Sequence, residues 1–122
     1  MISGIHTVAL TVRDQEKALE FYVGALGLEK RRDAPFGEGR WIEVAPADSA
    51  TSIALVAGDP APGGLGTAVR LASPDADAAH AELRERGVDV DPEVLRMGEY
   101  APPMFTLRDP DGNVLVVVEI TH

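Results

Sequence analysis

The pattern of hydrophobic and polar positions changes from strand-like to helix-like near the start of the chain. Residues 6–12 (HTVALTV) are rich in β-branched residues, which predicts a strand. Beyond this stretch, apolar residues recur at helical spacing, and Asp14 and Gly27 suit the N-terminal and C-terminal caps of a helix. Three short strands are expected next, at about residues 29–33, 40–45 and 51–56.

The same order of elements recurs about 60 residues later, which indicates an internal duplication. Residues 66–73 predict a strand, and a helix follows with Ser73 as its cap, Pro74 in its first turn and Gly87 at its end. Three more strands are expected, at about residues 91–97, 104–108 and 114–120. We therefore expect one domain of two modules, residues 1–57 and 66–122, joined by a Gly- and Pro-rich linker at 58–65.

Composition narrows the class of protein. The 122 residues are ordinary in apolar content, at 45%, and carry a formal charge of −9. This charge argues against nucleic-acid binding, and no apolar run is long enough to span a membrane. The absence of cysteine excludes disulfides and thiolate chemistry, and the N-terminus lacks the pattern of a signal peptide, so we expect a cytoplasmic protein.

A short basic cluster at residues 30–32 departs from the acidic composition. We expect it to be a solvated turn or edge strand, and the alternative is an anion site. Nucleophilic catalysis has no support, because no serine occurs in a nucleophile-elbow context. The stretch GGLG at 63–66 is not a phosphate loop, since it opens a predicted strand and lacks a following Lys-Ser/Thr.

Three stretches carry a resemblance to a known family: HTVALTVRDQEKALEFYVGALGLE, AVRLASPDADAAHAELRERGV and FTLRDPDGNVLVVVE. Together with the duplication, they resemble the vicinal oxygen chelate superfamily of glyoxalase I, extradiol dioxygenases, fosfomycin-resistance enzymes and bleomycin-resistance proteins. The resemblance covers essentially the whole chain. It implies an α+β fold in which two βαβββ modules form a curved mixed sheet around a cleft, and it implies a homodimer of bacterial type.

Metal-dependent members of this superfamily take a His from the first strand, a His from the start of the second half and a Glu from the last strand. The corresponding positions in this chain are Thr7, Gly66 and Val116, so no cofactor is expected. His6 and Glu119 are the nearby candidates, but each is an odd number of residues from the expected position and should face the other side of its strand. His6 is expected to point away from the cleft, or toward its rim if the strand begins irregularly.

A divalent metal remains the alternative if strand register is shifted by a bulge, which would bring His6 and Glu119 toward the cleft. Otherwise Glu119 is expected to belong to the end of its strand, where it pairs with a basic group or solvent.

Strand alternation then predicts which residues line the cleft. We expect a mostly apolar cavity with an aromatic wall and few polar groups, the usual make-up of a small-molecule site. The predicted ligand-binding residues on strands are Thr7, Ala9, Thr11, Trp41, Glu43, Arg70, Met104, Thr106 and Val116. The segment 96–104 is either a mobile flap, which would add Met97 and Tyr100, or a plain connection.

Trp41 and Glu43 are the two most informative candidates. The indole of Trp41 would stack a planar ligand or a cation, or would simply pack in the core. Glu43 would bind a ligand amine, pair with Arg70, remain solvated at the cleft mouth, or act as a catalytic base if burial raises its pKa.

The sequence thus favours a protein that binds a small organic molecule, such as a natural product or xenobiotic, without a metal. The alternative is an enzyme of the same superfamily. It would be a divalent-metal lyase, isomerase or dioxygenase, or a metal-free lyase or isomerase that uses Glu43.

Overall fold

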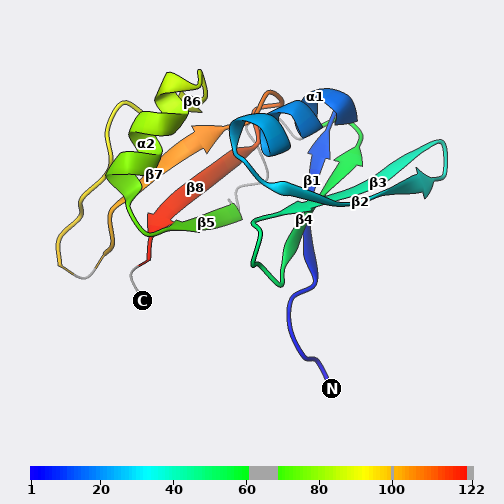
Figure 1. Ribbon diagram of the computed structural model, residues 1–122, viewed down its shortest axis with the longest axis horizontal. Coiled ribbons are helices and arrows are strands. Elements are labelled where there is room, and N and C mark those ends of the chain that lie inside the picture. Colours follow the sequence, from blue (N-terminus) through cyan, green and yellow to red (C-terminus); the bar gives the residue numbers. More distant parts are fainter. Residues whose placement is uncertain (61–68, 100, 121–122) are drawn as a thin grey trace. The chain divides into compact units, whose positions relative to one another are not determined.

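The computed structural model describes residues 1–60, 69–99 and 101–120, and Figure 1 shows the order of the elements along the chain. The chain divides into two compact units, Met1–Ala61 and Pro62–His122. Each unit contains a four-stranded sheet and follows the predicted order of strand, helix and three strands. The α+β class and the duplicated βαβββ arrangement predicted from the sequence are therefore confirmed.

The first unit contains a mixed sheet in the order β1-β4-β3-β2. β1 pairs in parallel with β4, and the other neighbouring pairs are antiparallel. The elements of this unit are β1 (Thr7–Val12), α1 (Gln15–Leu19), η1 (Glu20–Ala25), β2 (Glu29–Phe36), β3 (Gly39–Ala45) and β4 (Ser52–Ala57).

The helix of the first unit begins as predicted and then widens. The Asp14 carboxylate accepts hydrogen bonds from the backbone N–H groups of Glu16 and Lys17, so it is the N-cap. From Glu20 the backbone forms a π-helical turn, which the sequence did not predict. The helical turn ends at Ala25 with Leu26 as its C-cap, and the next residue, Gly27, has a φ of 75°, the left-handed conformation with which a glycine commonly terminates a helix.

One face of the first sheet forms the core of its unit. The buried residues on this face include Leu10, Val12, Ile42, Val44, Ile53 and Leu55. The helical segment adds buried Ala18 and Tyr22, and the Gln15 side-chain amide donates to the backbone oxygens of Arg40 and Leu55. The helix is therefore fixed to β3 and β4, and the opposite face of the sheet is left for other contacts.

We call that opposite face the site face, and strand pairing defines its residues. Ala54 pairs with both Ala9 and Glu43, and Glu43 pairs with Arg32 on β2. These four residues form one row across the sheet. The neighbouring Trp41 pairs with Ala34, which places a second row beside the first.

The second unit repeats this plan with the order β5-β8-β7-β6, and β5 and β8 are parallel. Its elements are β5 (Val69–Ser73), α2 (Ala76–Glu85), β6 (Asp89–Val90), β7 (Met104–Arg108) and β8 (Val114–Glu119). The core face of this sheet contains buried Phe105, Leu107, Leu115 and Val117. At the β7–β8 turn, the Asp109 carboxylate accepts from the backbone N–H groups of Asp111 and Asn113.

Several predicted boundaries differ from the structure. Asp75, not Ser73, caps α2, and the Ser73 hydroxyl instead accepts from the Asp75 backbone N–H. The strand predicted at 91–97 is wrong, because only Leu95 forms an isolated bridge there, to Met104. Pro92 explains this difference, since it has no N–H to donate to a ladder.

One strand is longer than predicted: β2 continues three residues past its predicted end at residue 33. It passes through Pro35, which is acceptable because β2 is an edge strand. The predicted linker at 58–65 and the first residues of the strand predicted at 66–73 lie partly outside the described residues. None of the helices in the described part of the chain is long and apolar enough to cross a membrane.

Candidate functional site

A hollow of about 440 Å³ lies on the site face of the first sheet. Residues from β2 and β3 form most of it, and one residue comes from the segment just before β1. The lining residues are His6, Arg32, Ala34, Pro35, Phe36, Trp41 and Glu43. We call this hollow the β2–β3 pocket. Its lining is mainly apolar and aromatic, with a few polar groups, as expected for a small-molecule site.

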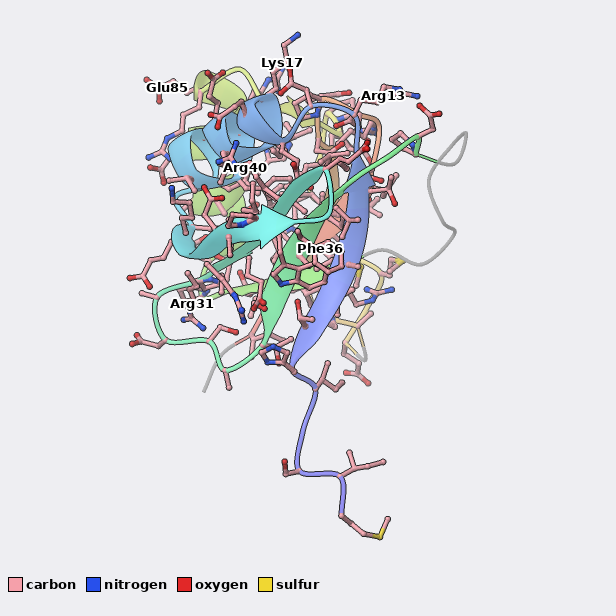
Figure 2. All side chains as sticks on the ribbon, turned by 90° about the vertical axis from the view of Figure 1, so that its right-hand side faces the viewer. Arg13, Lys17, Arg31, Phe36, Arg40 and Glu85 are labelled. Carbon is pink, nitrogen blue, oxygen red and sulfur yellow. The ribbon has the colours of Figure 1, made fainter. Side chains whose placement is uncertain are left out.

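The apolar wall of the pocket is a pair of aromatic rings. The ring centroids of Phe36 and Trp41 are 5.6 Å apart, with an angle of 65° between the ring planes. Figure 2 shows Phe36 near the tip of the β2–β3 hairpin, and 63% of its surface is exposed. An exposed aromatic side chain beside a half-buried indole is a surface on which a planar molecule can stack.

The floor of the pocket is the buried carboxylate of Glu43. One of its oxygens accepts from the Trp41 indole N–H at 2.7 Å, and the other accepts from the Ser52 hydroxyl at 2.7 Å. These two hydrogen bonds lower the pKa of Glu43, and the nearby His6 and Arg32 lower it further. Their combined effect exceeds that of burial, which acts in the opposite direction.

A catalytic base at Glu43 was expected only if burial raised its pKa. The structure gives the opposite direction, and both carboxylate oxygens are already occupied by donors. A carboxylate with a lowered pKa is a weaker base at neutral pH. The arrangement instead suits a fixed anion that holds the Trp41 indole in one orientation.

His6 lies at the rim of the pocket. Its Nε2 is 3.8 Å from Oε1 of Glu43, and its side chain is 79% exposed. Of the two expectations for His6, an orientation away from the cleft side is therefore wrong, and the rim position is observed. The reason is that His6 precedes β1, where strand alternation does not yet apply, while the Ser52 backbone N–H holds its carbonyl oxygen.

The other predicted residues of the first unit share the site face but do not line the pocket. Pairing in register with β4 places Thr7, Ala9 and Thr11 on the same side as Glu43. The Thr7 hydroxyl donates to the backbone oxygen of Ser52. Their role as ligand contacts remains a prediction.

The predicted residues of the second unit share one face of its sheet. Arg70, Val116 and Thr106 form one row, and Met104 lies in the next row, paired with Val118. Met97 is exposed in the segment that precedes β7. Tyr100 lies outside the described residues. Binding by these residues also remains a prediction.

The metal positions of the superfamily do not fit a metal in this chain. Val116 has no donor atom, the Thr7 hydroxyl is engaged with a backbone oxygen, and Gly66, which has no side chain, lies outside the described residues. Glu119 accepts from the backbone N–H of Ala76 at 3.0 Å, at the start of α2. Among the described residues, no three His, Asp or Glu side chains form a group that could hold a metal ion.

Sequence reasoning missed part of the pocket. Ala34, Pro35 and Phe36 come from the continuation of β2 past its predicted end, and Arg32 lies within the predicted strand but was not proposed as a lining residue. Ser52, the β4 partner of Glu43 beneath the pocket, was not proposed either. The alternation of residues 32, 34 and 36 is a signal for this group, but the predicted end of the strand at residue 33 hid its last two positions. Nothing in the sequence indicates Ser52, because its contact with Glu43 depends on the register between β3 and β4.

Residues 4–117 match the Glyoxalase/Bleomycin resistance protein/Dioxygenase superfamily. The chain therefore belongs to this superfamily, and the resemblance found in the sequence is confirmed.

Within the superfamily, the chain is similar to bacterial proteins. The antibiotic binding protein TnmS3 from Streptomyces sp. CB03234 is 38% identical, with a TM-score of 0.85 and 98% of each chain covered. A superfamily member from Sphaerobacter thermophilus DSM 20745 is 35% identical, with a TM-score of 0.86 and 98% of each chain covered. The uncharacterized protein YurT of Bacillus subtilis (strain 168) is 32% identical over 94% of this chain and 98% of its own.

Proposed function

We propose that this protein binds a small organic molecule with a planar group, a natural product or xenobiotic, in the β2–β3 pocket and without a metal. The observation that carries the proposal is the aromatic wall of Phe36 and Trp41 above a carboxylate that is already satisfied. A wall of this kind gives a planar ligand apolar contact area. The similarity to an antibiotic binding protein supports a ligand of natural-product size.

Glu43 contributes to binding by fixing the wall. Its hydrogen bond to the Trp41 indole limits rotation of that ring, so less side-chain freedom is lost when a ligand binds. The residues at the metal positions of the superfamily support binding without a metal, since Val116 has no donor atom and Thr7 offers only a neutral hydroxyl.

Trp41 also provides the measurement, because it is the only tryptophan of the chain. In a ¹⁵N-labelled sample its indole N–H gives one cross-peak, which reports on the pocket wall. We expect planar natural products to shift this cross-peak saturably in the presence of EDTA. The shift and the affinity should stay the same after Ni, Mn, Fe(II) or Zn salts replace EDTA.

Two outcomes would contradict the proposal. In one, binding appears only with a metal, and native mass spectrometry finds one metal per subunit that is lost in His6→Ala or Glu119→Ala. In the other, the wild-type protein converts a bound compound while Glu43→Gln binds it without conversion. That second result would make Glu43 catalytic. Glu38→Gln, which removes an exposed carboxylate in the β2–β3 turn, is the matched control.

A further inference from the structure

Arg32 is the cation of the β2–β3 pocket that is not engaged by the protein. It is exposed on β2, it pairs across the strands with Glu43, and it lines the pocket. Within the described residues its guanidinium donates no hydrogen bond and lies in no close ion pair, and its interaction with Glu43 acts only at longer range. Because a guanidinium carries five N–H donors in a planar fork, Arg32 presents unused donors at the pocket.

The neighbouring cations of β2 and β3 are engaged elsewhere. Arg31 donates to the backbone oxygens of Ser49, Pro46 and Ala47, in the loop after β3. Arg40 pairs with Asp33. These side chains serve the local structure, whereas Arg32 does not.

The carboxylate of Glu43, the negative group of the pocket, already accepts hydrogen bonds from the protein. Both oxygens of Glu43 accept from donors of the protein, Trp41 and Ser52, and only 8% of its side chain is exposed. A ligand ammonium would have to reach this nearly buried carboxylate and would also face the charge of Arg32. A carboxylate, phenolate or carbonyl oxygen on the ligand would meet Arg32 directly.

We infer that the β2–β3 pocket selects planar aromatic molecules that carry an anionic or strongly accepting oxygen, with Arg32 as the residue that recognises this oxygen. The inference rests on the proposed function and specifies its ligand class. It is an alternative to two of the expectations from the sequence, a ligand amine at Glu43 and a cation stacked on Trp41, and the test below distinguishes them.

The spacing along β2 allows both contacts at once. Arg32 and Ala34 point to the same side of the strand, and Ala34 pairs with Trp41. Two residues along a strand span about 6.6 Å. A bicyclic ring system that rests on Trp41 and Phe36 therefore places a substituent at its edge within reach of the Arg32 side chain.

The formal charge of −9 on the chain opposes the approach of an anion from a distance. At about 0.15 M salt this opposition is screened beyond about 8 Å, whereas a contact within the pocket is screened much less. Charge selection should therefore persist at physiological ionic strength.

The test compares three probes with the same ring: naphthalene-2-carboxylate, naphthalene-2-methanol and 2-naphthylmethylammonium. Their affinities are measured from the single Trp41 indole cross-peak at constant pH and salt. We expect the carboxylate to bind about tenfold more tightly than the alcohol, the size of one hydrogen bond between charged groups, and the ammonium to bind most weakly.

Variants assign the selection to one side chain. Arg32→Gln should remove the preference for the carboxylate and leave the affinity for the alcohol nearly unchanged. Arg32→Lys should keep part of the preference, because the charge remains while the planar fork is lost. Lys17→Gln is the control, since Lys17 projects from α1, well away from Phe36 in Figure 2.

The possible failures are distinguishable. If all three probes bind equally, or the ammonium binds as tightly as the carboxylate, the pocket binds planar molecules but the inference about charge is wrong. If the preference survives in Arg32→Gln, Arg32 is not the recognising residue. If no probe shifts the Trp41 cross-peak, while the protein is folded, both this inference and the proposed function are contradicted.

Discussion

Glu43 is a carboxylate that folding buries and at the same time satisfies. Its two oxygens accept from Trp41 on its own strand and from Ser52 on the neighbouring strand β4. An unpaired charge in this place would cost much of the stability of a small domain. The two hydrogen bonds offset this cost, and the one from Trp41 also fixes the position of the indole ring that forms the pocket wall.

Replacing Glu43 by Gln tests how much this pairing stabilises the fold. The amide can still accept from the Trp41 indole and can donate to the Ser52 hydroxyl, but both hydrogen bonds lose the assistance of the negative charge. We expect the free energy of unfolding, measured by urea titration, to fall by about 1–2 kcal/mol. The exposed Glu38→Gln variant should change it by less than about 0.5 kcal/mol. Equal losses in the two variants would show that the hydrogen bonds of Glu43 contribute nothing specific.

The same carboxylate predicts a dependence of stability on pH. The pKa of Glu43 is lower in the folded protein than its usual value of 4.5, so the unfolded chain binds its proton more readily. Its contribution to stability is therefore fully present above pH 4.5 and is lost as the pH falls through the folded pKa. Urea titrations at several pH values should show the difference between wild type and Glu43→Gln shrinking below pH 4.5. If this stability difference instead grows as the pH falls, the pKa of Glu43 is raised in the folded protein and not lowered.

At the scale of single residues, sequence reasoning correctly placed Trp41 and Glu43 on one face, because alternation along a strand depends on the backbone alone. It did not find Ser52 as the partner of Glu43, since that contact requires the register between two strands. For His6 it left two positions open, because His6 lies one residue before the point where alternation begins, and the rim position is the one observed. Local periodicity thus predicts faces, and only the pairing of strands predicts partners.

Two glycines in and after the helical segment of the first unit have different backbone conformations. Gly27 ends the helix with a φ of 75°, and Gly24 lies within the π-helical turn without a positive φ. A Cβ added at either position would have no atom within 4 Å. The two glycines therefore differ in backbone conformation and not in the space around them.

Substituting each glycine by Ala should change stability in opposite directions. Gly27→Ala is expected to lower the free energy of unfolding by about 1 kcal/mol, because a Cβ is strained at positive φ. Gly24→Ala should raise it by about 0.5–1 kcal/mol, because alanine restricts the unfolded chain and favours a helix. Urea titration of both variants measures the difference. If both substitutions are destabilising, the π-helical turn itself depends on Gly24.

At the scale of elements, each predicted strand has a counterpart in the described residues except the one at 91–97, and β6 at Asp89–Val90 was not predicted. The prediction also stopped β2 before the residues that form much of the pocket. Both differences involve proline. Pro92 interrupts a ladder, whereas Pro35 is accommodated because β2 is an edge strand. The effect of a proline therefore depends on where the strand lies in its sheet, which the local sequence does not give.

The whole molecule repeats one plan twice, and this repeat made the fold predictable from the sequence. Strand order and strand directions are the same in the two units, as expected from duplication of a single module. The site is less regular than the fold. β2, which supplies four of the pocket residues, has eight residues, whereas β6, the corresponding strand of the second unit, has only two.

We expect the protein to form a homodimer whose affinity rises with salt. The superfamily resemblance implies a dimer, and large apolar side chains outside the pocket are exposed, among them Ile5, Val8, Leu95 and Met97. Each chain also carries a formal charge of −9, so two chains repel one another at low ionic strength. Raising the salt from about 0.01 M to 0.15 M shortens the screening length from about 30 Å to 8 Å and weakens this repulsion.

Sedimentation velocity over a range of protein concentrations measures this association. The dissociation constant of the dimer should decrease as salt is added, because the apolar contacts persist while the repulsion is screened. A dissociation constant that increases with salt would mean that ion pairs, and not apolar contacts, hold the two chains together. If the protein is a monomer at every protein and salt concentration, the expectation of a homodimer is wrong. The β2–β3 pocket would then be a site of the single chain, because all its lining residues belong to one unit.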